Sequence, residues 1–306
     1  MNDMQIIYRL LPDSIRGELD EFFKHRSIKP QEIRLRVNRP VEINDGLRVY
    51  WLSKSRFSQI DAENFLSSIS EHSIYRLEQE LRQGYITIDG GHRIGITGRV
   101  NVENGRVRSI QHITSFNIRI AREQIGVSHS LIPVLWDNRW LNTLIIGPPQ
   151  SGKTTLLRDM ARVGATGSVN REATKVGIVD ERSEIAASVN GIPQMQLGYR
   201  TDVLDRCPKS EGMMMLIRSM SPEIIVVDEI GGEKDVYAVE EAVRAGASLF
   251  CTIHGEDYQD IQTRPSMKRL MKNQVFDRYV IVKHRKIIEV LDSKGQAIHW
   301  HSVPSV

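Results

Sequence analysis

Cysteine is nearly absent from this chain, with only Cys207 and Cys251 among its 306 residues. The two stand far apart and in no metal-ligand spacing. This excludes a disulfide framework and a cysteine-based metal site as the basis of the fold. Two inert thiols in a reducing compartment are the simpler interpretation.

Long apolar runs are also missing. No stretch reaches the roughly 18 apolar residues typical of a membrane-spanning helix. The first residues do not show a basic start followed by an apolar run, as a secretory signal would. We therefore expect a cytoplasmic protein that is peripheral at a membrane, if it works there, and reaches it through a partner.

The chain also has no large excess of positive or negative charge. Lysine and arginine number 41 against 38 aspartates and glutamates, a net charge of +3, which is a weak indication of a polyanionic partner. Hydrophobic residues make up 40% and charged residues 26% of the chain, as in ordinary globular proteins. The length favours two domains, each with its own core.

Residues 1–125 are expected to form a smaller α+β domain. The patterns that indicate it are helical apolar spacing, strand-like alternation of apolar and basic residues, and Asp-Gly and Asn-Gly turns. The expected helices cover 4–25, broken at Pro12-Asp13, and 62–84. The expected strands are 32–43, a meander over 85–110 with turns at 89–91 and 103–105, and 115–123.

Residues 126–306 alternate strand and helix patterns, which predicts βαβ units and a parallel sheet covered by helices. The expected strands are 141–146, 175–180, 223–230 and 247–254, and the expected helices are 153–162, 211–220 and 234–246. Residues 279–300 resemble an antiparallel extension that turns near Lys294-Gly295.

A phosphate-binding loop sequence joins the first expected strand to the first expected helix of this half. Its glycines allow backbone N–H groups to converge on phosphate oxygens at the start of a helix. The residues assigned to nucleotide binding are Gly147, Pro148, Pro149, Gln150, Ser151, Gly152, Lys153, Thr154 and Thr155. Lys153 is expected to reach the β- and γ-phosphates of ATP, and Thr154 to ligate Mg²⁺.

Acidic residues follow two apolar strands and complement this loop. Asp228 suits the Mg²⁺ shell, and Glu229 is placed to polarise the attacking water. Glu181 follows the earlier strand and is the alternative general base. His254 ends the next strand along the chain, where a neutral imidazole can hydrogen-bond a phosphate or the catalytic water.

Arginines supply the remaining expected site residues. Arg119 and Arg122 lie on one basic strand near the domain boundary and are candidates to reach over the nucleotide from the same or a neighbouring subunit. Arg218 is a third candidate, because guanidinium binds phosphate in a bidentate manner. Solvated surface positions are the simpler alternative for at least some of these side chains.

The phosphate loop, the acidic segment IVDERSE, the segment IRSMSPEIIVVDEIGG and the strand ending in TIHG together resemble the secretion ATPase superfamily of type II and type IV secretion and pilus machines. Within it, the closer similarity is to the ATPases of the sporulation channel in endospore-forming bacteria. The resemblance implies a RecA-like P-loop NTPase domain and a homo-oligomer, expected to be a hexamer. It also implies membrane channel proteins of the sporulation apparatus as partners, on the mother-cell side.

One departure concerns the acids. Secretion ATPases usually carry Gly-Glu where this chain has Asp228-Glu229. The aspartate restores an ordinary magnesium-binding arrangement, and it leaves open whether Glu229 or Glu181 is the base.

Two other functions compete with an ATP-driven motor. The first is a nucleic-acid-binding or translocating ATPase, because related sheets drive helicases. However, no aromatic residues that could stack on bases are interleaved with the arginines, so nucleic acid is not the expected partner. A nucleotide switch that hardly turns over is the other rival, and such a switch does not need both Glu229 and His254.

Overall fold

The computed structural model describes residues 3–24, 26–70, 84–103 and 105–300. The chain divides into two compact units, Met1–Arg122 and Glu123–Val306.

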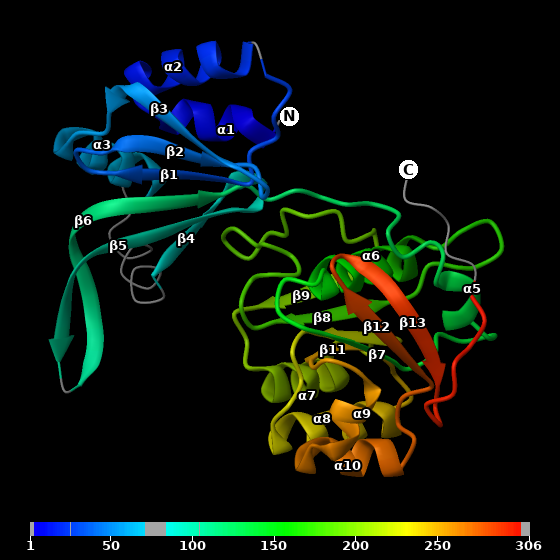
Figure 1. The fold of residues 1–306 in the computed structure, drawn as a ribbon. Coiled ribbons are helices and arrows are strands. Elements are labelled where there is room, and N and C mark those ends of the chain that lie inside the picture. Colours follow the sequence, from blue (N-terminus) through cyan, green and yellow to red (C-terminus); the bar gives the residue numbers. More distant parts are fainter. Residues whose placement is uncertain (1–2, 25, 71–83, 104, 301–306) are drawn as a thin grey trace. The chain divides into compact units, whose positions relative to one another are not determined.

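The first unit is an antiparallel sheet with helices (Figure 1). Its helices are α1 (Asp3–Leu10), α2 (Asp13–Lys24) and α3 (Gln59–Ile69). Its strands are β1 (Glu32–Arg36), β2 (Pro40–Asn44), β3 (Val49–Arg56), β4 (Tyr85–Ile88), β5 (His92–Glu103) and β6 (Arg106–Arg119), with the 3₁₀ turn η1 (Asp89–Gly91) between β4 and β5. The strand order is β3-β2-β1-β6-β5-β4.

Alternating burial explains how this sheet holds its helices. Strands β1 and β2 bury every second side chain, so one face forms a core while the other faces solvent. In that core, Phe57, Phe65 and Phe116 pack edge to face, with ring centroids 4.9–6.3 Å apart. Such aromatic pairs stabilise a core beyond the area they bury.

Three expectations for this unit need correction. The single strand expected over residues 32–43 is two strands, because Asn38 adopts a left-handed conformation (φ 60°) and Arg39 N donates to Arg36 O at 3.0 Å in a turn between them. Residues 106–119 form one strand rather than two separate ones, and β3 was not predicted. Helix α3 begins at Gln59, before the predicted start, because Ser58 and Asp61 form a capping box. The expected helix beyond Ser70 lies largely outside the described residues, and the turn expected at 103–105 includes Asn104, which also lies outside them.

The second unit is built on a mostly parallel sheet (Figure 1). Its strands are β7 (Thr143–Gly147), β8 (Val176–Asp180), β9 (Thr201–Asp205), β10 (Ile224–Val227), β11 (Ser248–His254), β12 (Arg278–Lys283) and β13 (Lys286–Asp292). Its helices are α5 (Ile132–Leu135), α6 (Lys153–Thr166), α7 (Lys209–Ser219), α8 (Glu233–Arg244), α9 (Tyr258–Thr263) and α10 (Pro265–Lys272).

The strand order β13-β12-β7-β11-β10-β8-β9 is parallel throughout except for the β12–β13 pair. Helix α6 covers one face, while α7 and α8 pack on the other, with α10 against α8 (Figure 1). The strands β7, β8 and β10 are buried on both faces, as expected for a parallel sheet between helix layers. The predicted α/β fold with a parallel sheet is therefore confirmed.

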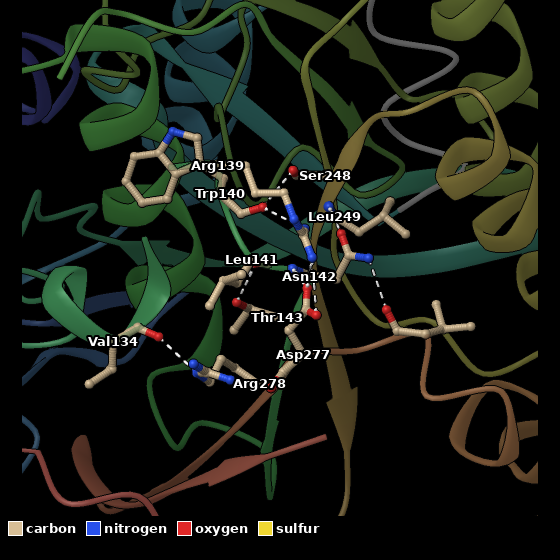
Figure 2. Close-up of polar contacts among 11 residues, drawn as sticks. Val134, Arg139, Trp140, Leu141, Asn142, Thr143, Ser248, Leu249, Asp277 and Arg278 are labelled. Carbon is tan, nitrogen blue, oxygen red and sulfur yellow. Dashed lines mark hydrogen bonds and ion pairs between the residues drawn. The ribbon is translucent and has the colours of Figure 1, made fainter. Parts of the chain in front are cut away.

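Polar contacts fasten the amino ends of the central strands (Figure 2). Asn142 N donates to Asp277 Oδ2 at 2.8 Å, its side-chain nitrogen donates to Val275 O at 2.9 Å, and its Oδ1 accepts from Leu249 N at 3.0 Å. Asn142 thus ties together the starts of β7, β11 and β12. This network holds the strand that leads into the phosphate loop in register with its two neighbours.

The C-terminal hairpin turns at a different place from the one predicted. Strands β12 and β13 are joined at His284-Arg285, where both residues have positive φ (50° and 62°), the conformation that tight hairpin turns require. The chain also turns at Lys294-Gly295, but this turn leads only to an isolated bridge between Leu291 and Ala297. Strand β9 and helices α9 and α10 were not predicted. Within the described part of the chain, no helix combines the length and the apolar character needed to cross a bilayer.

Candidate functional site

The loop between β7 and α6 packs closely on its surroundings. A Cβ atom on Gly147 would collide with the carbonyl oxygen of Val282 and lie 2.6 Å from Ser151 Oγ, so only glycine fits. Gly152 has φ 102° and begins the turn into α6. Gln150 is also left-handed, with φ 60°. Each predicted glycine therefore occupies a position that has no room for a side chain or that has an unusual backbone conformation.

Lys153 opens α6 with its amine inside the loop. Its Nζ donates to Gly147 O at 2.8 Å and to Pro148 O at 2.9 Å, and lies 3.1 Å from His254 Nδ1. The residue is 5% exposed. Burial lowers the pKa of Lys153, while Asp228 and Glu229 oppose that shift. The amine is thus held at the mouth of the loop, where a phosphate oxygen could replace the carbonyl oxygens.

Thr154 joins the loop to the acid-ended strand. Its Oγ1 donates to Asp228 Oδ2 at 2.8 Å. The other carboxylate oxygen of Asp228 accepts from Thr252 on β11. Burial raises the pKa of Asp228, and the two hydroxyl groups oppose the shift. The loop and the end of β10, distant in sequence, therefore form a single cluster.

Glu229 stands beside this cluster in a strained conformation. Its φ is 54°, an uncommon value for a residue other than glycine and one often found at functional sites. Its N–H donates to Thr252 Oγ1 at 2.8 Å. Its carboxylate lies 2.6 Å from His254 Nε2 and 3.0 Å from Arg182 NH1.

The contacts of His254 indicate its tautomer. Since the Lys153 amine can only donate, Nδ1 is the acceptor of that contact, and Nε2–H then donates to Glu229. His254 thus links the cation of the loop to the carboxylate of Glu229.

The alternative base lies apart from this cluster. Glu181 follows β8 and pairs with Lys209 at the start of α7. The carboxyl group next to it, Asp180, is 1% exposed and accepts from the N–H groups of Glu184, Ile185 and Ala186 at 2.8–3.0 Å. Burial raises the pKa of Asp180 to about 6, although these bonds oppose the shift. Asp180 organises the acidic segment, while Glu181 is held by a lysine.

Of the three predicted arginines, Arg218 belongs to the second unit, and Arg119 and Arg122 belong to the first. Arg218 is in the last turn of α7 and exposed. It lies just before the amino end of β10, opposite the edge at which the loop stands. Arg119 belongs to the first unit, with its Nε 4.0 Å from Glu32 Oε1. Arg122, also in that unit, donates to Pro30 O at 2.7 Å.

Sequence reasoning assigned no role to Thr252 or Arg182, which both contact the acids of the site. A signal for Thr252 was present: it precedes His254 by two residues on one strand, so their side chains share a face. Arg182 gave no comparable signal, because its contact with Glu229 joins two loops that follow different strands.

The residues fit a magnesium ion bound together with phosphate. Mg²⁺ prefers oxygen ligands and is usually held by one or two carboxylates plus substrate phosphates. Thr154 Oγ1 and Asp228 Oδ2 are such oxygens, in contact with each other. Among the described residues, no group of three or more histidine, cysteine or acidic side chains is suited to hold a metal. Protein side chains alone therefore do not form a complete metal site there.

The fold is that of RecA-like secretion ATPases. The structure matches the ATPase DotB of Legionella pneumophila with a TM-score of 0.61 at 14% identity, covering 93% of this chain and 82% of that one. It matches the pilus retraction motor PilT, solved with bound ADP, with a TM-score of 0.56 at 15% identity, covering 86% and 77%.

Sequence comparison identifies the family to which this chain belongs. The family model of sporulation stage III, protein AA matches residues 1–298, and the chain belongs to that family. It is 50% identical over 300 residues to stage III sporulation protein AA of Bacillus subtilis (strain 168), covering 96% of this chain and 97% of the relative. The predicted resemblance to this sporulation family is thereby confirmed.

Proposed function

We propose that this protein is a Mg²⁺-dependent ATPase that powers or assembles the sporulation channel between mother cell and forespore. The observation that carries the proposal is the 2.8 Å bond between Thr154 and Asp228. It joins the phosphate-loop sequence to an acid at the carboxyl edge of the sheet, where open α/β sheets bind ligands. The names of the structural relatives also support an ATPase, since DotB is called an ATPase and PilT is called a motor and was solved with bound ADP.

The binding step follows from the loop. Backbone N–H groups of the loop and the start of α6 attract phosphate oxygens, and Lys153 donates to them in place of the carbonyl oxygens it now contacts. Thr154 and Asp228 would hold Mg²⁺, which neutralises developing charge on the phosphates. The nine residues from Gly147 to Thr155 remain the proposed nucleotide-binding set.

The hydrolytic step is assigned to Glu229 rather than Glu181. Glu229 adjoins Lys153 through His254, whereas Glu181 is engaged by Lys209. A carboxylate within hydrogen-bond reach of the attacking water can take its proton in the transition state. His254, which donates to Glu229, would orient that carboxylate and report the presence of the phosphate to it.

The remaining assignments concern assembly and location. We propose a homo-oligomer, a hexamer by analogy with secretion ATPases, in which Arg119, Arg122 or Arg218 covers the nucleotide of the same or a neighbouring subunit. The protein would act in the cytoplasm, peripheral to the membrane on the mother-cell side, with channel proteins as partners.

ATP hydrolysis by the purified protein tests the proposal. Lys153→Ala should lower phosphate release to background and greatly weaken nucleotide binding, because the phosphates lose their nearest side-chain cation. Lys268→Ala removes an exposed lysine from α10 and should leave the rate unchanged. Equal rates for wild type and Lys153→Ala would refute the proposed function.

A further inference from the structure

The turn between β12 and β13 is strongly basic. His284 and Arg285 form the turn, with Lys283 at the end of β12 and Lys286 at the start of β13. In the sheet, β12 lies next to β7 and runs parallel to it, so the turn emerges at the same edge as the phosphate loop. The sequence did not connect the two, because some 130 residues separate them.

Backbone contacts fasten this turn to the loop. Arg285 N donates to Ser151 O at 2.9 Å. A Cβ atom on Gly152 would lie 3.4 Å from Arg285 Cα and 3.7 Å from its Cβ and Cγ. Arg285 thus lies beside Gly152, the residue that precedes α6.

The guanidinium group itself is open to a ligand. Arg285 is exposed, and it forms no ion pair with any described residue, whereas the neighbouring Lys283 is 3.5 Å from Glu256. The other cation at the loop, Lys153, is already in contact with two carbonyl oxygens and His254. A further cation at the loop would stabilise polyphosphate that is bound beside the acidic groups of Asp228 and Glu229.

We propose that Arg285 is a nucleotide-binding residue whose guanidinium contacts the phosphate chain of a nucleotide held by the loop Gly147–Thr154. Guanidinium groups bind phosphate oxygens in a planar, bidentate manner. The proposal rests on the proposed function, since it concerns the same nucleotide. It identifies a cation within the second unit itself, in addition to the arginines inferred from the sequence.

Binding of ADP and of inorganic tripolyphosphate to the full chain, measured by calorimetry, tests this assignment. Arg285→Gln keeps a polar side chain but removes its charge, and it should weaken the binding of both ligands about tenfold, as expected for one lost charge-assisted contact. Arg285→Lys should recover part of the affinity. Lys286→Gln removes the same charge one residue away and should change either affinity less than about twofold.

The outcomes separate this proposal from the proposed function. Wild-type protein that binds neither ligand would overturn both. Wild-type binding with equal affinity in Arg285→Gln would overturn only the role of Arg285. A loss confined to ADP, with tripolyphosphate unaffected, would also overturn it, because the contact would then be to the nucleoside. Thermal unfolding without ligand should be the same for the three variants and wild type, which excludes a purely structural effect of the turn.

Discussion

Glu229 is the residue at which the strain and the contacts of the site coincide. Its positive φ is held by the bond from its N–H to Thr252, and its carboxylate lies between His254 and Arg182. A left-handed conformation at a residue other than glycine costs of order 1–3 kcal/mol. This arrangement holds the carboxylate close to the loop, which is the reason to prefer Glu229 over Glu181 as the base.

Glu229→Gln should preserve ATP binding and reduce turnover by about 10²-fold or more, because the amide cannot accept the proton of the attacking water. Glu181→Gln, the matched change in the acid that pairs with Lys209, should affect turnover far less. Single-turnover hydrolysis with nucleotide binding measured in parallel distinguishes these effects. If Glu181→Gln lowered turnover more than Glu229→Gln, the base would be Glu181.

Helix α6 connects the loop to the first residues of the second unit. Asp159 on this helix accepts from Gly126 N at 3.0 Å and from Ser128 N and Oγ at 2.8 and 2.7 Å. Arg162 Nε donates to the same carboxylate at 2.8 Å. The segment that follows the boundary at Arg122 is therefore anchored on the helix that begins at Lys153, so a shift of that helix would move the anchor too.

Asp159→Asn should lower the free energy of unfolding by about 2–3 kcal/mol at pH 7, because charge-assisted bonds to a buried carboxylate are lost. Burial opposes ionisation of Asp159, but the bonds from Ser128, Gly126 and Arg162 outweigh it and lower its pKa. A lowered folded-state pKa stabilises the protein above the unfolded pKa of about 4, and that stabilisation is lost as the pH falls through the folded value.

The difference between wild type and Asp159→Asn should therefore shrink as the pH falls below about 4. Chemical denaturation at a series of pH values measures it, and Glu172→Gln, a change in an exposed acid of the same unit, serves as control. A difference that stays constant down to pH 3 would contradict the role given to the carboxylate charge.

At the scale of the whole molecule, the candidate site residues belong to two units. The loop, both acids and His254 are in the second, while Arg119 and Arg122 are in the first. If these arginines act on the nucleotide of a neighbouring subunit, hydrolysis depends on assembly and rises faster than linearly with protein concentration.

Mixing two inactive chains tests this dependence. One carries Arg119→Ala and Arg122→Ala, and the other carries Lys153→Ala. Mixed oligomers should recover part of the ATPase activity, since some sites then combine an intact loop with intact arginines from the neighbour. Oligomers confirmed by light scattering that remain as inactive as their parents would count against arginines supplied between subunits.

The sequence by itself determined the features whose cause is local. Apolar strands buried on both faces, such as β7 and β10, show as continuous apolar runs, and the loop at Gly147–Thr154 is recognisable because its conformation requires glycine at fixed positions. The alternation of strand and helix patterns was enough for a parallel α/β sheet, because parallel strands require such crossovers.

Only the tertiary structure decided which distant residues meet. Arg285 reaches Ser151 because β12 takes the place next to β7, and Arg182 reaches Glu229 because β8 and β10 are neighbours. The Asp89–Gly91 turn was predicted from its glycines, but the position of the C-terminal turn was not: His284-Arg285 lacks glycine, yet both residues adopt positive φ where the hairpin packs on the phosphate loop. Strand order is set by how the helices cover both faces of the whole sheet, a property that no local pattern of residues contains.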